Sequence, residues 1–342
     1  MGSKIRFGVV GFGHIGKRHA SMINGNDESE VVAVADIDEA RQKEATEILG
    51  SSAKVYASIE ELLKNPDVDI VNICTPNGWH AKQALWTLDA KKHVVIEKPM
   101  GLNRQECEEV IFKSLQVSKH AFIVKQNRYS PTSVWLKSLI AEGKLGETFM
   151  VQMNCYWNRD DRYYKKGGWK GLKNMDGGVL FTQFSHFLDI MYWLFGDIKN
   201  INARFQNFNH SKSTEFIDTG FVGFEFINGG LGTINFSTSI WGQNMESSIA
   251  IIGEKGSVKV SGQYMDTVSH CVVEDYEMPT LPPANPPNDY GAYKGSAANH
   301  HYVIQNVVDV LQGRSQITTN ALEGMKVVEM IERIYQEGTY LS

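Results

Sequence analysis

Residues 5–16 read IRFGVVGFGHIG, and this stretch decides the fold of the first part of the chain. The apolar run 5–10 is typical of a buried strand, and a GxGxxG turn follows it and opens an amphipathic segment. Such a turn lets a pyrophosphate approach the N–H groups at the start of a helix. Asp36 ends the next apolar run, 20 residues after Gly16, where a carboxylate would accept hydrogen bonds from ribose hydroxyls. We therefore expect a dinucleotide to bind at Asp36 and at Gly11, Phe12, Gly13, His14, Ile15 and Gly16.

The residue at position 36 also indicates which dinucleotide binds. A carboxylate there would repel a 2′-phosphate, so we expect NAD rather than NADP. Arg41, five residues further on, could pair with a 2′-phosphate, so NADP remains an alternative. The alternative is that the glycines only shape a turn and that Asp36 caps a helix starting near Glu39.

The pattern of apolar residues divides the chain into two regions. Up to about Tyr129, short β-rich runs alternate with amphipathic stretches, as in a parallel sheet covered by helices. After it, long alternating runs favour antiparallel strands, and a Pro-rich stretch from Met278 indicates an extended loop. We expect an α/β Rossmann domain over 1–128 and an α+β domain with a large, mostly antiparallel sheet over 129–342. Helices are expected near 15–24, 39–49, 59–64, 79–90, 104–118, 131–142, 180–195, 299–311 and 322–336.

Composition excludes several classes of protein. The 342 residues carry a net charge of −5 without a basic block, so nucleic acid is not an expected partner. No run of about 18 apolar residues suggests a membrane span, and no signal-peptide pattern opens the sequence, so we expect a cytoplasmic location. The four cysteines form no CxxC pair, so we expect reduced thiols and no metal site.

Several further motifs carry a resemblance to a known family. They are TPN at 75–77 with His80, EKP at 97–99, KQNRYSP at 125–131, and DGG at 176–178 leading to His186 and Asp189. With the glycine turn and Asp36, they make nearly the whole chain resemble the glucose–fructose oxidoreductase, inositol dehydrogenase and rhizopine-catabolism (Gfo/Idh/MocA) family. The resemblance implies that the second sheet is open, that one face of it meets another subunit in a homodimer or homotetramer, and that a sugar is the substrate. It adds to the cofactor site Thr75, Pro76, Asn77, His80, Glu97 and Lys98.

Two residues are candidates for acid–base chemistry. Hydride transfer from an alcohol needs a base that works near neutral pH and a group that polarises the oxygen, and Lys98 and His186 could supply them. Lys98 ends a strand at the carboxyl edge of the expected parallel sheet, where ligands bind. The alternatives are that Lys98 is a solvated charge, that His186 is a satisfied core histidine, and that Asn77 is a helix N-cap. Asp189 could orient the His186 ring or bind elsewhere.

One departure from the family pattern bears on the substrate. The commoner pattern has Asp four residues before the histidine, whereas this chain has Thr182, which can only hydrogen-bond. Thr182-Gln183 resembles the branch that oxidises C3 of UDP-N-acetylglucosaminuronate. Expected substrate-binding residues are Arg128, Tyr129, Trp169, Thr182, Gln183 and His186.

Cationic residues around the expected cleft would suit an anionic substrate, with Arg128 the first choice. The others are Arg159, Arg162, Lys165, Lys166 and Lys170. The competing readings are a dehydrogenase of a free sugar or inositol, an NAD-using glycoside hydrolase, and a dinucleotide-binding regulator without chemistry. Intact Lys98 and His186 argue against the regulator.

Overall fold

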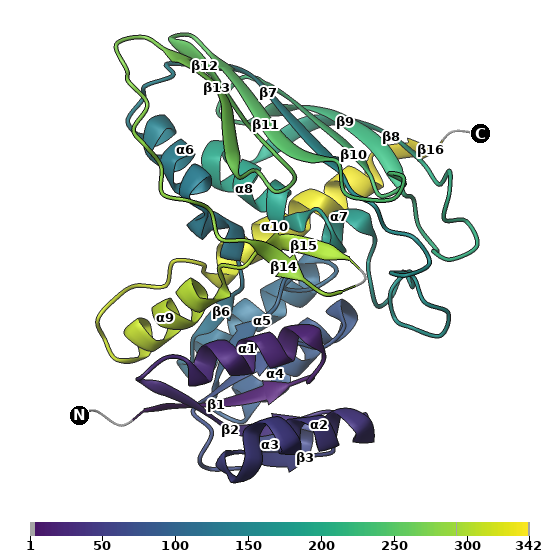
Figure 1. Cartoon of the computed structure of the whole chain (residues 1–342), viewed down its shortest axis with the longest axis vertical. Helices are drawn as coiled ribbons and strands as arrows, with labels where there is room; N and C mark the ends of the chain where they lie inside the picture. The colour runs from purple at the N-terminus through teal and green to yellow at the C-terminus, as the bar shows by residue number, and fades with distance from the viewer. Residues whose placement is uncertain (1–3, 292, 341–342) are drawn as a thin grey trace. The chain divides into compact units, whose positions relative to one another are not determined.

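The computed structural model describes residues 4–291 and 293–340, which form two compact units. The first unit contains the chain up to Lys125 together with His300–Val328, and the second contains Gln126–Asn299 and the chain from Glu329 on. Figure 1 shows the chain coloured along its length. These units differ from the expected ranges 1–128 and 129–342, because residues 300–328 return to the first unit. Apolar periodicity predicts a helix there but does not show which core that helix joins.

The first unit contains a parallel sheet of six strands in the order β3-β2-β1-β4-β5-β6. All four residues of β4 are buried, as expected for a strand covered on both faces. The expected Rossmann sheet is confirmed, and the short edge strand β3 is an addition to it. The strands are β1 (Ile5–Val10), β2 (Ser29–Ala35), β3 (Lys54–Tyr56), β4 (Ile70–Ile73), β5 (His93–Ile96) and β6 (Ala121–Ile123).

Three helices of the first unit begin at a residue whose side chain caps the first turn. Asp38, Ser58 and Asn103 accept hydrogen bonds from N–H groups of the first turns of α2, α3 and α5. The helices are α1 (His14–Asn24), α2 (Glu39–Leu49), α3 (Ile59–Leu63), α4 (His80–Asp89), α5 (Arg104–Val117), α9 (His300–Leu311) and the first part of α10 (Ala321–Gln336), with short 3₁₀ helices η1 (Gly50–Ser52) and η2 (Asn77–Trp79). Gln305 of α9 accepts a hydrogen bond from Asn26, so the returning segment is fastened to the end of α1.

The second unit contains an eight-stranded sheet in the order β13-β12-β11-β7-β10-β9-β8-β16. Neighbouring strands are antiparallel except β10 with β7 and β16 with β8, so the expected mostly antiparallel sheet is confirmed. The strands are β7 (Thr148–Tyr156), β8 (Ile198–Gln206), β9 (Thr219–Phe226), β10 (Leu231–Ser237), β11 (Glu246–Gly253), β12 (Gly256–Ser261), β13 (Thr267–Val273) and β16 (Gly338–Tyr340). The Pro-rich stretch expected to be only a loop also contains a hairpin, β14 (Pro287–Asp289) with β15 (Lys294–Ala297).

Helices cover one face of this sheet. Figure 1 shows α6 (Pro131–Ala141) and α8 (Ser185–Phe195) on that face, and in the described chain no helix of this unit covers the other. Trp157 packs edge-on against Phe184 and Phe187 beneath the sheet. The single helix expected over 180–195 is wrong, because it is broken into α7 (Val179–Thr182) and α8. The 3₁₀ helix η3 (Gln126–Tyr129) precedes α6.

None of the helices in the described part of the chain has the length and apolarity needed to cross a membrane.

Candidate active site

The glycine turn has the geometry that its sequence predicts. Gly11 has φ of +87°, and a Cβ there would lie 2.8 Å from the carbonyl oxygen of Cys74. A Cβ on Gly16 would collide with the carbonyl oxygen of Gly11. Gly13 occupies the N-cap position of α1, which begins at His14. Strand, turn and helix therefore pack at a separation that side chains at Gly11 and Gly16 would prevent.

Asp36 is placed at this turn by its own hydrogen bonds. Its Oδ2 accepts from the N–H of Phe12 at 2.6 Å, and its Oδ1 accepts from the N–H of Asp38 at 2.9 Å. A carboxylate has about four acceptor positions, so both oxygens keep capacity for ribose hydroxyls. The N-cap of α2 is Asp38, which accepts from the N–H of Ala40, so the alternative that Asp36 caps this helix is not observed.

Arg41 lies on the same side of the turn. A Cβ on Gly13 would meet the Arg41 guanidinium, and Arg41 Nε lies 3.5 Å from Asp38 Oδ2. Arg41, which the sequence offers as a possible partner for a 2′-phosphate, therefore lies close to the turn and beside the carboxylate of Asp38.

At the end of β5, the EKP segment is connected to the TPN segment through His80. Lys98 is half-buried and the Lys98–Pro99 peptide bond is cis. The ring nitrogens of His80 lie 2.6 Å from Pro99 O and 2.8 Å from Thr75 O. Burial lowers the pKa of His80 although both carbonyl oxygens favour its charged form. His80 thus joins the two segments expected to contact the cofactor, and its ring is turned toward protein backbone.

The other residues of the TPN segment are also fixed within the first unit. Thr75 Oγ1 donates to Gln83 Oε1 at 2.6 Å. Asn77 is buried and begins η2, whose N-cap is Pro76. The N-cap position of α4 is held by Trp79 rather than by Asn77.

Glu97 belongs to a buried cluster that sequence reasoning missed. His19 Nε2 donates to Glu97 Oε1 at 2.8 Å, His300 Nε2 lies 3.6 Å from the same oxygen, and the N–H of Lys98 donates to Glu97 Oε2 at 3.1 Å. Burial alone would raise the pKa of Glu97, but the two histidines hold it well below its usual range. Both carboxylate oxygens are therefore engaged by the first unit. The available signal was the spacing of His19, which lies three residues after Gly16 and so on the inward face of α1.

The same cluster offers three groups that could hold a metal ion, although sequence predicts none. Asn72 Nδ2 donates to His19 Nδ1 at 2.8 Å, which leaves Nε2 as the protonated nitrogen that faces Glu97. A metal ligand needs that nitrogen unprotonated. The hydrogen bonds of His19 thus place a proton on the nitrogen that faces Glu97.

In the second unit, Thr182, Gln183 and His186 lie at the break between α7 and α8. The N–H of Phe184 donates to Val179 O, an i to i+5 hydrogen bond typical of a π-type turn, which often marks a functional site. Gln183 is 2% exposed, and neither its amide oxygen nor its amide nitrogen has a hydrogen-bond partner among the described residues. His186 is 7% exposed. The break therefore holds a buried amide to which no described residue hydrogen-bonds.

Arg128 and Asp189 form a buried ion pair. Arg128 Nε donates to Asp189 Oδ2 at 2.8 Å and Nη2 donates to Oδ1 at 2.7 Å. Both side chains are at most 4% exposed, and the guanidinium lies 5.4 Å from the ring centroid of Trp193. Asp189 is thus observed to bind Arg128. Arg128, expected first among the cations to contact substrate, directs two of its nitrogens to this carboxylate.

The other expected cations differ in their surroundings. Arg159 is buried between Trp157 and Tyr163, and Lys170 Nζ donates to the hydroxyl of Tyr293 at 2.9 Å. Arg162 pairs with Asp160 at the surface. The remaining expected residues are the exposed Lys165 and Lys166 and the half-buried Tyr129 and Trp169.

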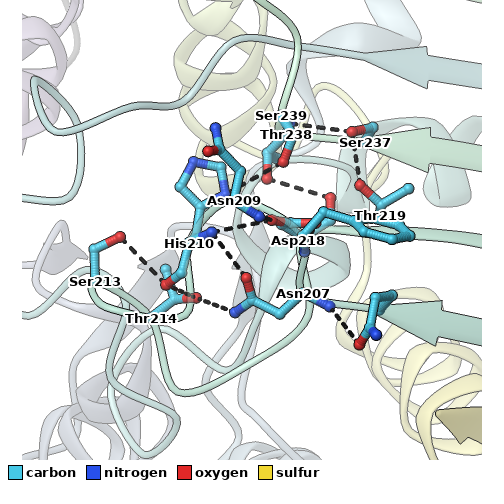
Figure 2. Close-up of polar contacts among 12 residues, drawn as sticks. Asn207, Asn209, His210, Ser213, Thr214, Asp218, Thr219, Ser237, Thr238 and Ser239 are labelled. Atoms are coloured by element: carbon cyan, nitrogen blue, oxygen red, sulfur yellow. Dashed lines mark hydrogen bonds and ion pairs between the residues drawn. The ribbon is translucent and has the colours of Figure 1, made fainter. Parts of the chain in front are cut away.

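A polar network in the second unit supports the segment that carries Trp169. Figure 2 shows Asp218 at its centre, where Oδ2 accepts from the N–H of Asn209 at 2.7 Å and from His210 Nδ1 at 3.0 Å. Burial would raise the pKa of Asp218, but the hydrogen bonds from His210 and from backbone amides hold it well below its usual range. The N–H of Glu215, in the same loop, donates to Gly171 O at 2.8 Å. The network thus holds a loop against the segment that precedes α7.

The first unit carries a GxGxxG turn with an acceptor at Asp36 and a lysine at the end of β5. The second unit is an open sheet with a histidine at a helix break. These features are typical of a dinucleotide-dependent oxidoreductase. Comparison with known families agrees with this class. Residues 5–123 match the Gfo/Idh/MocA oxidoreductase family with an NAD-binding Rossmann fold, and residues 134–259 match the C-terminal domain of the same family. The chain belongs to the Gfo/Idh/MocA family, and it is an NAD-dependent oxidoreductase, as the resemblance implies.

Solved structures of relatives agree along almost the whole chain. The chain is 31% identical to the WlbA dehydrogenase of Chromobacterium violaceum, with a TM-score of 0.88 over 98% of this chain and 94% of that one. It is 29% identical to the WlbA dehydrogenase of Bordetella pertussis, with a TM-score of 0.86 over 98% and 96%. Both relatives were crystallised with NADH and UDP-GlcNAcA. A myo-inositol 2-dehydrogenase of Thermotoga maritima is 26% identical over 265 residues, 74% of each chain.

Proposed function

We propose that this enzyme oxidises the C3 hydroxyl of a UDP-linked uronic acid sugar such as UDP-N-acetylglucosaminuronate. The observation that carries the proposal is the buried Gln183 amide between Thr182 and His186, which has no protein partner among the described residues. A buried amide without a hydrogen-bond partner lowers the stability of the fold by about 1–3 kcal/mol. A ligand whose hydroxyl and carbonyl groups hydrogen-bond to this amide would recover that free energy. The likeness to two dehydrogenases crystallised with UDP-GlcNAcA supports this class of substrate.

Lys98 and His186 divide the proton chemistry in this proposal. Oxidation of an alcohol removes a hydride and a proton, and NAD, when bound, accepts the hydride. One of the two side chains takes the hydroxyl proton while the other donates a hydrogen bond to the oxygen that becomes a carbonyl. Thr182 and Gln183 hydrogen-bond the sugar ring, with Tyr129 and Trp169 beside it, and the expected role of Arg128 toward an anionic group remains part of the proposal.

The proposed cofactor contacts follow the expectation from sequence. The turn from Gly11 to Gly16 would hold the pyrophosphate, and Asp36 would accept hydrogen bonds from the ribose hydroxyls. The segment Thr75, Pro76 and Asn77 and the segment Glu97-Lys98 form the nicotinamide side, with His80 holding the two segments together.

We also infer a homodimer or homotetramer assembled through the uncovered face of the large sheet. Met150, Leu231 and Ile252 are directly paired on neighbouring strands and are 41%, 54% and 48% exposed. Contiguous exposed apolar side chains usually mark a contact surface. Light scattering after gel filtration would show a monomer for Leu231→Glu and an oligomer for the unchanged chain, and a monomeric unchanged chain would contradict the inference.

A cytoplasmic location remains part of the proposal. The described cysteines are free thiols and three of them are buried, which fits a reducing compartment.

A second candidate function is dehydrogenation of a free polyol, which the likeness to a myo-inositol 2-dehydrogenase favours. The experiment that separates the two is NADH formation with a panel of UDP-sugars, their uronates, free sugars and inositol. We expect kcat/KM to be highest for a UDP-linked uronate, because charge-assisted contacts to carboxylate and diphosphate add binding energy that a neutral sugar lacks. Equal or higher kcat/KM for inositol would refute the nucleotide-sugar assignment. Cleavage of a glycoside without net NADH would instead identify a hydrolase.

A further inference from the structure

Thr182 is linked to a buried carboxylate that sequence reasoning did not assign. The Thr182 hydroxyl donates to the carboxylate of Asp176, six residues earlier in the DGG segment, and also lies 3.0 Å from the Asp176 backbone carbonyl oxygen. The N–H of Gly171 donates to Asp176 Oδ2 at 2.9 Å, and Asp176 is fully buried whereas Thr182 is half-buried. Asp176 therefore lies behind Thr182, which is the more accessible member of the pair.

The surroundings of Asp176 place its titration near neutral pH. Burial raises the pKa of Asp176 to about 6, against the opposing effects of the Thr182 and Gly171 hydrogen bonds and of the Lys170 charge. The charged and titratable groups of the described chain that act on Asp176 include Lys170, Tyr163, Tyr164 and Tyr335. Burial raises the pKa of all three tyrosines, so these phenols stay neutral between pH 5 and about 8 while Asp176 changes charge.

The backbone around Asp176 is held in one arrangement. Gly178 has φ of +119°, and a Cβ there would lie 2.6 Å from the hydroxyl of Tyr335. The same hydroxyl accepts from the N–H of Leu180 in α7 at 3.0 Å. The turn between Asp176 and Thr182 is therefore packed against α10, which leaves little room for the pair to separate.

The charge of Asp176 decides what Thr182 can do. A hydroxyl has one hydrogen and two acceptor positions. While Asp176 is ionised it can only accept, so it holds the Thr182 hydrogen and turns the oxygen lone pairs outward. When Asp176 is protonated, its own O–H can donate to Thr182, and the carboxyl group no longer holds the Thr182 hydrogen.

We propose that Asp176 is a positioning residue that fixes the Thr182 hydroxyl as a hydrogen-bond acceptor for a substrate hydroxyl. The inference rests on the proposed function, in which Thr182 contacts the sugar. It adds a carboxylate that acts through Thr182. Asp189 lies three residues beyond His186, but it is paired with Arg128.

The test is a double-mutant cycle with pH as a variable. Asp176→Asn keeps the shape but can donate as well as accept, so it resembles the protonated acid. With a sugar that the unchanged enzyme oxidises, we expect Asp176→Asn to lower kcat/KM by about three- to tenfold at pH 8, the usual worth of one directed hydrogen bond. This ratio should approach one below pH about 6, where the unchanged enzyme is protonated too.

The cycle distinguishes positioning from a structural role. In a Thr182→Val background, Asp176→Asn should cause no further loss, because the group through which Asp176 acts is gone. Thr182→Ser should keep both the rate and the pH dependence of the ratio. An effect of Asp176→Asn that is equal in the two backgrounds, or independent of pH, would overturn the proposal.

A second measurement does not depend on turnover. Infrared difference spectra follow the C=O stretch of a protonated carboxyl group, and the band of Asp176 is the one lost in Asp176→Asn. We expect it to titrate near pH 6 in the unchanged protein and at a higher pH in Thr182→Val, since the Thr182 hydrogen bond lowers the pKa. If no sugar is oxidised, the proposed function fails while this measurement still tests the pair. An unchanged midpoint in Thr182→Val would overturn the inference alone.

Discussion

Replacing Arg128 by alanine should destabilise the second unit because it leaves a buried carboxylate without its partner. Arg128 and Asp189 are 4% and 2% exposed and share two hydrogen bonds of 2.7 and 2.8 Å. Removing one member of a buried ion pair costs about 3–5 kcal/mol, most of it from the charge that remains. For a unit of this size, each kcal/mol shifts the melting midpoint by about 2–4 °C, so we expect a decrease of roughly 6–20 °C.

The chain offers a matched control at its surface. Arg162 pairs with Asp160 through similar contacts, Nε to Oδ1 at 2.9 Å and Nη2 to Oδ2 at 2.7 Å, but these side chains are 54% and 40% exposed. Water replaces the lost contacts there, so Arg162→Ala should leave the midpoint nearly unchanged.

Scanning calorimetry of the two variants measures the difference. A decrease of equal size in both would refute the argument that burial sets the cost. The double variant Arg128→Met with Asp189→Leu should recover much of the loss, since it removes both charges. Activity of Arg128→Ala on anionic and neutral substrates is then compared at a temperature where the variant is folded, which separates substrate contact from stability.

Three further predictions concern the first unit. Lys98→Ala should lower turnover by about 10²–10⁴-fold with NAD affinity near that of the unchanged enzyme, and near-normal turnover would show that Lys98 is only a strand-end charge. Asp36→Ala should weaken NAD binding in calorimetric titrations by roughly 10- to 100-fold, the worth of charged hydrogen bonds, and NADP binding much less; unchanged NAD affinity would place the ribose elsewhere. Glu97→Gln should lower the urea midpoint above pH about 4.3, the ordinary pKa of glutamate. This difference should shrink as pH falls through the lowered pKa of folded Glu97. A difference that grows in acid would show that the pKa of folded Glu97 is not lowered.

Sequence predicted best where local chemistry dictates structure. The glycine turn forms as the sequence predicts, because a positive φ at Gly11 and close packing at Gly11 and Gly16 are requirements of the backbone itself. The strands of both sheets were predicted from their apolar patterns, with β3, β13 and β16 as the additions. These edge strands are short or half-exposed, so their patterns are weak.

The features that sequence did not predict depend on contacts between distant residues. The apolar pattern of 180–195 is continuous, and the break at Gln183 arises from the i to i+5 hydrogen bond of Phe184. The pairing of Thr182 with Asp176 depends on the conformation of two glycines between them, which composition alone does not fix. The pairing of Arg128 with Asp189 joins η3 to α8, and no local signal in either segment indicates the other.

His300 belongs to the first unit but is synthesised after almost all of the second unit. Glu97 and His300 are separated by roughly two hundred residues, yet they meet in one buried cluster with His19. During synthesis on a ribosome, the first unit therefore cannot complete its fold until almost all of the second unit has emerged, because α9 and α10 come last. A nascent chain released after residue 128 would expose the surface that α9 covers and leave one histidine beside Glu97. Such a fragment should bind chaperones or aggregate, and dinucleotide binding should appear only after synthesis is almost finished.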